Sequence, residues 1–160
     1  MPERMGEAMT VDRSFVARNN AERARLKALI SGASDADLSH AMPAGWTVAG
    51  VLAHMAFWDQ RLFVLFDRWE QLGIQPPTET PDDVEWINNT VKPLILALPP
   101  RRAAEVALAI AEAVDRRVET LSHDLVARNA AAGEPLNLAR ADHRGEHLDE
   151  IQQVLGKKNR

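Results

Sequence analysis

The segment PAGWTVAGVLAHMAFWDQRLFVLFDRW, residues 43–69, is the most strongly apolar part of the chain. Its apolar side chains recur at spacings of three and four residues, which is the repeat of an amphipathic α-helix; they are Val51, Met55, Trp58, Leu62, Leu65, Phe66 and Trp69. Thr47 is a suitable N-cap, because its hydroxyl can accept a hydrogen bond from a backbone N–H of the first turn. We therefore expect a long helix after Thr47 that packs at the centre of the protein.

The segments on either side of this helix also have helical periodicity, and no stretch alternates as a strand would. The pattern predicts helices over 12–31, from 81 onward, over about 101–131 and over about 142–155, with a short turn at 35–38. Thr80 and Pro81 provide a cap and a first helical residue for the third helix, which Pro93 should kink or end early. Long helices joined by short loops predict an all-α protein, a helical bundle around one apolar core.

Composition limits the classes of protein to which the chain can belong. A length of 160 residues with 46% hydrophobic content predicts a single domain over residues 1–160. The net charge is −4 and the basic residues are interspersed with acids, so we expect no nucleic-acid partner. No apolar run reaches membrane-spanning length, which predicts a cytoplasmic protein with no membrane segment. The chain has no cysteine, so any metal would depend on histidine and carboxylate ligands.

Two histidines lie four residues apart in HRGEH, residues 143–147. On a helix, His143 and His147 differ by roughly 40° and share a side with Ile151 and Val154, so both should face inward. Such a pair can present two imidazoles to one metal ion. The alternative is that one histidine is buried with a backbone partner and the other is exposed.

His54 adds a third candidate ligand, since it lies at the edge of the apolar stripe beside Val51 and Trp58. Three inward imidazoles suit zinc, nickel, copper or ferrous iron and leave a coordination position open, as in catalytic rather than structural zinc sites. A histidine at the edge of a core can instead be satisfied by a neighbouring carbonyl, and the residues alone leave both interpretations open. A carboxylate-bridged di-iron bundle is excluded, because no histidine has a glutamate three residues before it.

The segment GWTVAGVLAHMAFWDQRL, residues 45–62, together with the late HRGEHLDEI, residues 143–151, resembles the DinB-like superfamily. This group includes the N-terminal domains of mycothiol-dependent maleylpyruvate isomerases, and the similarity covers nearly the whole chain in length and helix order. The resemblance implies an up-down-down-up four-helix bundle, here with an extra short helix or kinked connection. It also implies a divalent metal, zinc or nickel, on three histidines, and His54, His143 and His147 match those positions.

The activities implied by the resemblance are thiol-dependent transferase or isomerase chemistry with a low-molecular-weight thiol, and in some relatives hydrolysis, on a small-molecule substrate. Helical phase places Glu150 one turn beyond His147 and Arg61 two turns beyond His54. Glu150 could orient an imidazole or accept a proton, and Arg61 could hold an anionic substrate. The alternative for both is a solvated charge at the rim of the bundle.

Aromatic and amide side chains are further candidates for a pocket. Trp46 precedes the helix and is a pocket candidate, whereas Trp58 and Trp69 are expected in the core. Asn88 and Asn89 could reach the pocket or act as caps. The alternative to an enzyme is a non-catalytic binding or interaction protein, a homodimer formed through an apolar helix face.

Overall fold

The computed structural model describes residues 10–158, and helices account for 76% of the structure, so the expectation of an all-α protein is confirmed. The elements are α1 (Phe15–Gly32), α2 (Asp35–Leu38), β1 (Ala41–Met42), a 3-10 turn (Pro43–Gly45), β2 (Trp46–Thr47), α3 (Val48–Leu72), α4 (Pro81–Leu96), α5 (Pro100–Glu119), α6 (His123–Ala131) and α7 (Arg140–Lys158). Within the described residues, none of the helices combines the length and apolar character needed to cross a membrane.

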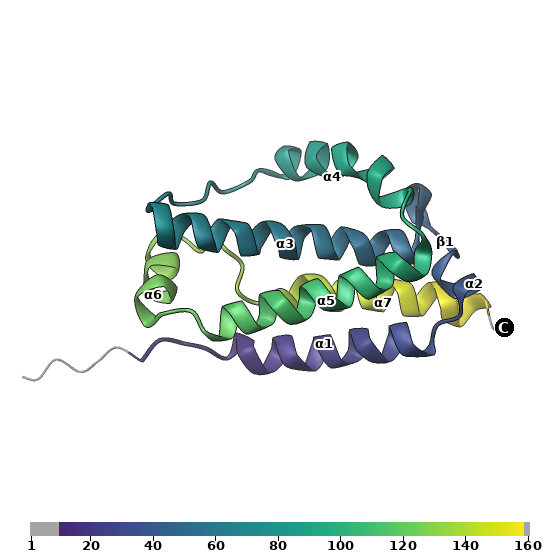
Figure 1. Cartoon of the computed structure of the whole chain (residues 1–160), viewed down its shortest axis with the longest axis horizontal. Coiled ribbons are helices and arrows are strands. Elements are labelled where there is room, and N and C mark those ends of the chain that lie inside the picture. Colours follow the sequence, from purple (N-terminus) through teal and green to yellow (C-terminus); the bar gives the residue numbers. More distant parts are fainter. Residues whose placement is uncertain (1–9, 159–160) are drawn as a thin grey trace, which may run out of the picture.

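Four long helices, α1, α3, α5 and α7, lie lengthwise beside one another (Figure 1). The contacts between them are α3 with α5, α5 with α1, α1 with α7, and α7 with α3. The colours of Figure 1 show that α1 and α7 run in one direction and that α3 and α5 run in the other. Helix α4 packs against α3 and carries the chain back along the length of the molecule to the start of α5.

Local signals explain where the central helix begins. The Thr47 hydroxyl accepts a hydrogen bond from the backbone N–H of Gly50 at 2.9 Å, as the sequence predicts for an N-cap. The short antiparallel pair β1 and β2 precedes this cap, with Ala41 opposite Thr47. Between the strands, Ala44 and Gly45 adopt left-handed φ values of 59° and 74°, which turn the chain back on itself.

The expected single helix over 101–131 is wrong, because α5 ends at Glu119 and α6 starts at His123. The Ser122 hydroxyl accepts the N–H of Leu125 at 3.1 Å, so a new helix is capped where the sequence has neither glycine nor proline. Helix α4 has the predicted cap at Thr80, which forms a capping box with Asp83, and it continues through Pro93 to end three residues later at Leu96. The other observed bounds differ from the expected ones by at most three residues.

The interior contains two apolar clusters. The first draws on residues 48–56 of α3 and 103–111 of α5, and the second on 62–69 of α3 and 114–118 of α5. Asp59 lies between the two clusters along α3, and only 3% of it is exposed. The core is thus interrupted by polar groups rather than being apolar throughout.

Asp59, Asp115, Arg140 and Arg144 form this interruption, which we call the buried charge layer. Arg144 donates to both carboxylates, at 2.9 and 3.1 Å to Asp115 and at 3.2 Å to Asp59. The Nε of Arg140 donates to Asp59 at 2.8 Å, and Arg23 on α1 pairs with Asp115 at 2.6 Å. Each buried carboxylate therefore has two arginine partners, which compensates for the loss of water around it.

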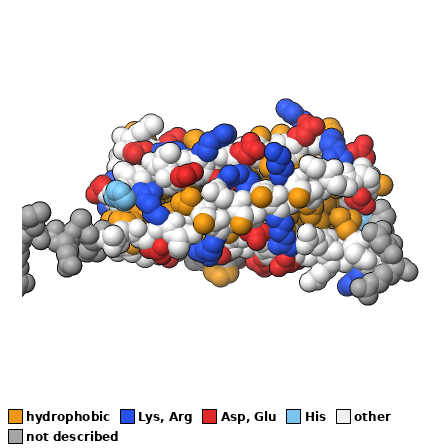
Figure 2. Space-filling model, turned by 90° about the horizontal axis from the view of Figure 1, so that it is seen from below, with side chains coloured by type: hydrophobic (Ala, Val, Ile, Leu, Met, Phe, Trp, Pro, Cys, Tyr) orange, Lys and Arg blue, Asp and Glu red, His pale blue; other side chains and the backbone are white. Residues whose placement is uncertain are grey.

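Outside the core, acidic and basic side chains are mixed. Figure 2 shows one face on which Lys and Arg alternate with Asp and Glu, without a large area of one sign. Some of these charges link helices, as in the pairs Arg18–Asp142 and Arg25–Asp149 between α1 and α7.

Candidate metal centre

The structure brings His54 of α3 together with His143 and His147 of α7. Their ring centroids are 5.3 Å apart for His54 and His143, 5.0 Å for His54 and His147, and 4.7 Å for His143 and His147. One ligand atom from each residue lies within 4.8 Å of the others. The three candidate ligands named by the sequence therefore converge on one point at the edge of the bundle.

The two α7 histidines are oriented toward each other through their Nε2 atoms, which are 3.1 Å apart. This is roughly the separation of two nitrogens that both bind one zinc ion at about 2.0–2.1 Å. On the other side of the ring, Nδ1 of His147 lies 3.1 Å from a carboxylate oxygen of Glu150. An Nδ1–H that donates to a carboxylate leaves Nε2 with its lone pair, which is the arrangement found behind many metal-bound histidines.

His54 is a buried imidazole with an unmatched nitrogen. Only 8% of the residue is exposed, and its Nδ1 has no hydrogen-bond partner among the described residues. The ring of Trp46 lies 5.6 Å away at a tilt of 59°. A buried polar atom without a partner is costly, and metal coordination of this imidazole is one way to offset that cost. The donor set therefore fits a divalent ion with imidazole preference.

Burial keeps two of these imidazoles neutral. Removal from water lowers the pKa of His54 to about 4, with a smaller contribution from the charge of His147. For His143, removal from water and then the charges of His147 and Arg140 lower the pKa to about 2. Neutral imidazole is the form that donates a lone pair to a metal, so both rings are ready for coordination at neutral pH.

Two pockets meet at the three histidines. The wide pocket has a volume of about 690 Å³, and the narrow pocket has a volume of about 410 Å³. Both are lined by His54, Val84, Asn88 and His147. The wide pocket is further lined by Met42, Pro43, Ala44, Trp46, Val51, Pro81, Glu85, Asn89, Lys92, Glu150, Gln153, Val154 and Lys157, and the narrow pocket by Trp58, Asn137, Arg140 and His143.

A family comparison is consistent with this geometry. The family model described as the DinB superfamily matches residues 18–151, which include all three histidines. The chain belongs to the DinB superfamily. Comparison with curated proteins and with solved structures gives no significant match. The resemblance of the α3 and α7 motifs to this family is therefore confirmed, while the metal and the reaction stay predictions.

The aromatic and amide candidates are distributed as follows in this DinB-superfamily chain. Trp46 lines the wide pocket, as expected for a residue before α3, and Trp69 is buried in the second apolar cluster. Trp58 is half-buried and donates from Nε1 to Asn88 at 2.9 Å, which ties α3 to α4. Asn88 and Asn89 both reach the wide pocket rather than acting as caps.

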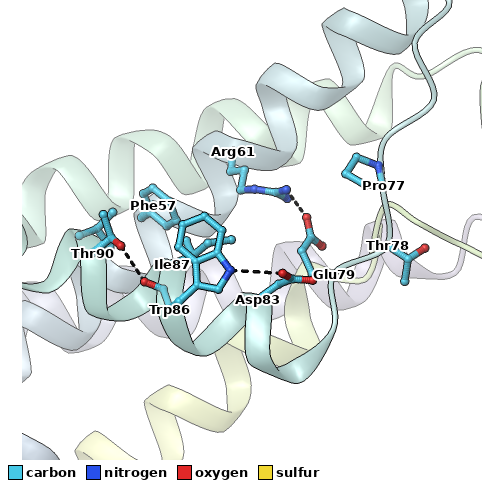
Figure 3. A pocket seen from close by; sticks show the side chains of 10 residues that line it. Phe57, Arg61, Pro77, Thr78, Glu79, Asp83, Trp86, Ile87 and Thr90 are labelled. Atoms are coloured by element: carbon cyan, nitrogen blue, oxygen red, sulfur yellow. Dashed lines mark hydrogen bonds and ion pairs between the residues drawn. The ribbon is translucent and has the colours of Figure 1, made fainter.

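Arg61 lines a different pocket from the histidines. It forms an ion pair with Glu79 across a separate pocket of about 560 Å³ between α3 and α4 (Figure 3). The guanidinium also lies 5.4 Å from the centre of the Trp58 ring. Arg61 lines neither the wide nor the narrow pocket, so its expected contact with an anionic substrate stays a prediction that this geometry does not favour.

The sequence interpretation missed the charged residues that adjoin the site, above all Arg140 and its partner Asp59. A signal was present, because Asp59 lies in the apolar stripe of Met55, Leu62 and Phe66, and a charge at such a position requires a buried partner. The same signal marks Arg144, which precedes Leu148 and Ile151 of the first apolar cluster at helical spacing.

Proposed function

We propose that this DinB-superfamily chain is a metal-dependent enzyme that acts on a small molecule, with zinc or nickel held by His54, His143 and His147. The observation that carries the proposal is the convergence of three imidazoles, one with a buried unpartnered nitrogen, where two pockets meet. We also propose that α1, α3, α5 and α7 form the up-down-down-up four-helix bundle of the family, with α4 as the long connection.

When bound, the divalent ion supplies a Lewis acid that makes a thiol or water nucleophilic near neutral pH. The chain's own residues prepare its ligands. Glu150 holds the His147 ring through Nδ1, and half of the Glu150 side chain is exposed at the wide pocket. Its second carboxylate oxygen is available to take a proton from a ligand in that pocket. Trp46 and Val51 form an apolar wall beside His54 that limits the access of water.

The presence of two pockets favours a reaction with two organic reactants over simple hydrolysis. The wide pocket falls in the size range of small-ligand sites, and the narrow pocket joins it at His54 and His147. A low-molecular-weight thiol and an acceptor can therefore approach the three histidines from different sides. This arrangement supports thiol-dependent transferase or isomerase chemistry as the first candidate and hydrolysis as the second.

A non-catalytic bundle that dimerises is the alternative function, and one surface feature supports it. A third groove of about 580 Å³ lies between α3, α4 and α5, with Val64 and Leu98 exposed at 46% and 41% along it. Apolar side chains in such a groove suit a second copy of the chain. Sedimentation analysis of wild-type protein and of Val64→Glu tests this alternative.

Elemental analysis of protein purified without an affinity tag tests the metal centre. We expect equimolar metal in wild-type protein incubated with zinc or nickel and then desalted, and loss of that metal in His54→Ala and His147→Ala. His123→Ala is the matched control, because His123 is exposed on α6 and outside the triad. Wild-type protein without metal, or equal metal in all four proteins, would contradict the proposal.

The reaction class is tested with metal-loaded protein, small electrophiles and a low-molecular-weight thiol, with products followed by mass spectrometry. A product that carries the thiol supports transfer, and a product formed equally well without thiol supports hydrolysis. Glu150→Gln should slow either reaction more than Glu146→Gln, because Glu146 lies on the exposed side of α7.

A further inference from the structure

Arg140, the first residue of α7, is a buried cation at the site. Its side chain is only 7% exposed, and it lines the narrow pocket together with His54, His143 and His147. Among the described residues that line this pocket, it is the one charged side chain, and the pocket contains no carboxylate. The wide pocket, in contrast, has the acids Glu85 and Glu150 among its lining residues.

The guanidinium is fixed by the protein but not fully satisfied. Its Nε donates to Asp59 at 2.8 Å, and its Nη1 donates to the backbone oxygen of Asn137 at 3.3 Å. No described residue accepts a hydrogen bond from Nη2. A guanidinium carries five N–H donors, so one edge of a rigid group is left with donors to offer into the pocket.

The surrounding charge also favours an anion. Three guanidiniums, those of Arg23, Arg140 and Arg144, face the two carboxylates of Asp59 and Asp115, so one positive charge is left over. A carboxylate or phosphate that enters the pocket would therefore meet the uncompensated positive charge of a buried guanidinium.

The uncharged side chains that line the narrow pocket offer hydrogen-bond donors rather than acceptors. The Asn88 side-chain oxygen accepts from Trp58 at 2.9 Å, so the Asn88 amide NH₂ is the group left to face a ligand. Trp58 and Val84 supply apolar surface, and a volume of about 410 Å³ suits one end of a small molecule.

From this arrangement we infer that Arg140 binds the anionic group of the substrate, a carboxylate or a phosphate, in the narrow pocket beside the three histidines. The inference deepens the proposed enzyme function, on which its catalytic meaning rests, by assigning the substrate class. Of the other cations near the pockets, Arg61 pairs with Glu79, and the Lys92 ammonium donates to the backbone oxygen of Ala44 and lies 4.9 Å from the Trp46 ring. Lys157 is exposed and lines the wide pocket, not the narrow one. Asp59 is a positioning residue that holds the guanidinium in place.

Anion titrations of the metal-free protein test the inference independently of the metal. Succinate and inorganic phosphate are the probes, with chloride as the non-oxyanion arm, and the histidine ring resonances and the Arg140 Nε–H are followed by NMR. We expect saturable shifts with one or both oxyanions, and the tighter of the two identifies the preferred group. Arg140→Gln should weaken binding by about tenfold or more, the loss of one charge-assisted hydrogen-bonded pair.

Three further variants make the result decisive. Arg102→Gln removes an exposed cation from α5 and should bind as wild type. Arg140→Lys keeps a positive charge toward Asp59 but loses the planar guanidinium with its five donors. We therefore expect this variant to fold cooperatively but to bind oxyanions less tightly than wild-type protein. Arg61→Gln tests the competing candidate, and a loss confined to this variant would overturn the inference. Wild-type affinity in folded Arg140→Lys or Arg140→Gln, or no saturable binding in wild-type protein, would also overturn it.

Metal content separates this inference from the proposed function. We expect Arg140→Lys to retain zinc like wild-type protein while oxyanion binding is weakened. If wild-type protein bound no zinc but showed Arg140-dependent oxyanion binding, the metal proposal would fail and the anion site would stand. If zinc bound and oxyanion binding did not depend on Arg140, the reverse would hold.

Discussion

The three histidines and the buried charge layer are two polar regions inside one bundle, and they differ in how completely they are satisfied. Each carboxylate of the layer has two arginine partners, and Arg144 is 1% exposed. At the histidines, the Nδ1 of His54 has no partner in the described part of the chain, and two pockets open onto the rings. Fully paired carboxylates suit a structural role, whereas unmatched groups beside open space, here His54 Nδ1 and the free edge of Arg140, mark a place where a ligand binds.

The largest effect is expected from removing Arg144 from the buried charge layer. Arg144→Met removes the residue that bridges Asp59 and Asp115 and leaves both carboxylates with fewer partners. We expect the free energy of unfolding in urea to fall by about 3–5 kcal/mol, as for other buried ion pairs that lose one partner. A loss below about 1 kcal/mol would show that the buried contacts of Arg144 stabilise the fold no more than an exposed ion pair does.

Metal binding at the three histidines should stabilise the folded protein. Zinc at about 100 times its dissociation constant should raise the free energy of unfolding of wild-type protein by about 2.7 kcal/mol. The same addition to His54→Ala should have little effect, because one imidazole of the triad is missing. Thermal unfolding with and without zinc measures both, and an equal shift in both proteins would place the bound zinc elsewhere.

A smaller effect is expected behind the His147 ring. Glu150→Gln replaces the carboxylate that holds Nδ1, so zinc affinity should fall by about 10–100-fold. Competition with a chelating dye measures the affinity, and Glu146→Gln on the same helix is the control. Unchanged affinity in Glu150→Gln would mean that this 3.1 Å contact does not support the ligand.

The smallest effect concerns an exposed ion pair between α1 and α7. The Arg18 and Asp142 side chains are 54% and 61% exposed, so Arg18→Gln should cost no more than about 1 kcal/mol in urea. Comparison of Arg18→Gln with Arg144→Met shows how far the loss of stability depends on burial of the ion pair. Both variants remove a charge pair between two helices, α1–α7 in one case and α5–α7 in the other. If Arg18→Gln lost as much stability as Arg144→Met, burial would not explain the difference expected between the two pairs.

Sequence periodicity predicted what depends on a single helix. The apolar stripe and the Thr47 cap of α3 are local properties, and the four-residue spacing of His143 and His147 places their rings together without reference to other elements. Glu150 contacts His147 for the same reason, since both lie on α7 three residues apart. To predict that His54 meets the two α7 histidines, one must also know that the side of α3 that carries His54 faces the core.

Sequence reasoning failed where the partner comes from a different element. Arg61 has the correct phase on α3, but Glu79 in the segment before α4 pairs with it, and helical phase carries no information about that segment. Asp59 and Arg140 are 81 residues apart, so neither appeared as half of a pair. The break between α5 and α6 depends on one serine cap that competes with a continuous helical pattern.

Helix α4 packs on α3, and within it Ile95 alone is buried. Yet its Val84 and Asn88 line both pockets at the histidines, and its Trp86 and Ile87 line the pocket beside Arg61. One wall of the ligand space is thus formed by a helix that contributes little to the buried core. Substitutions on α4 can therefore reshape this wall at little cost in stability, while His54 on α3 and His143 and His147 on α7 stay in place.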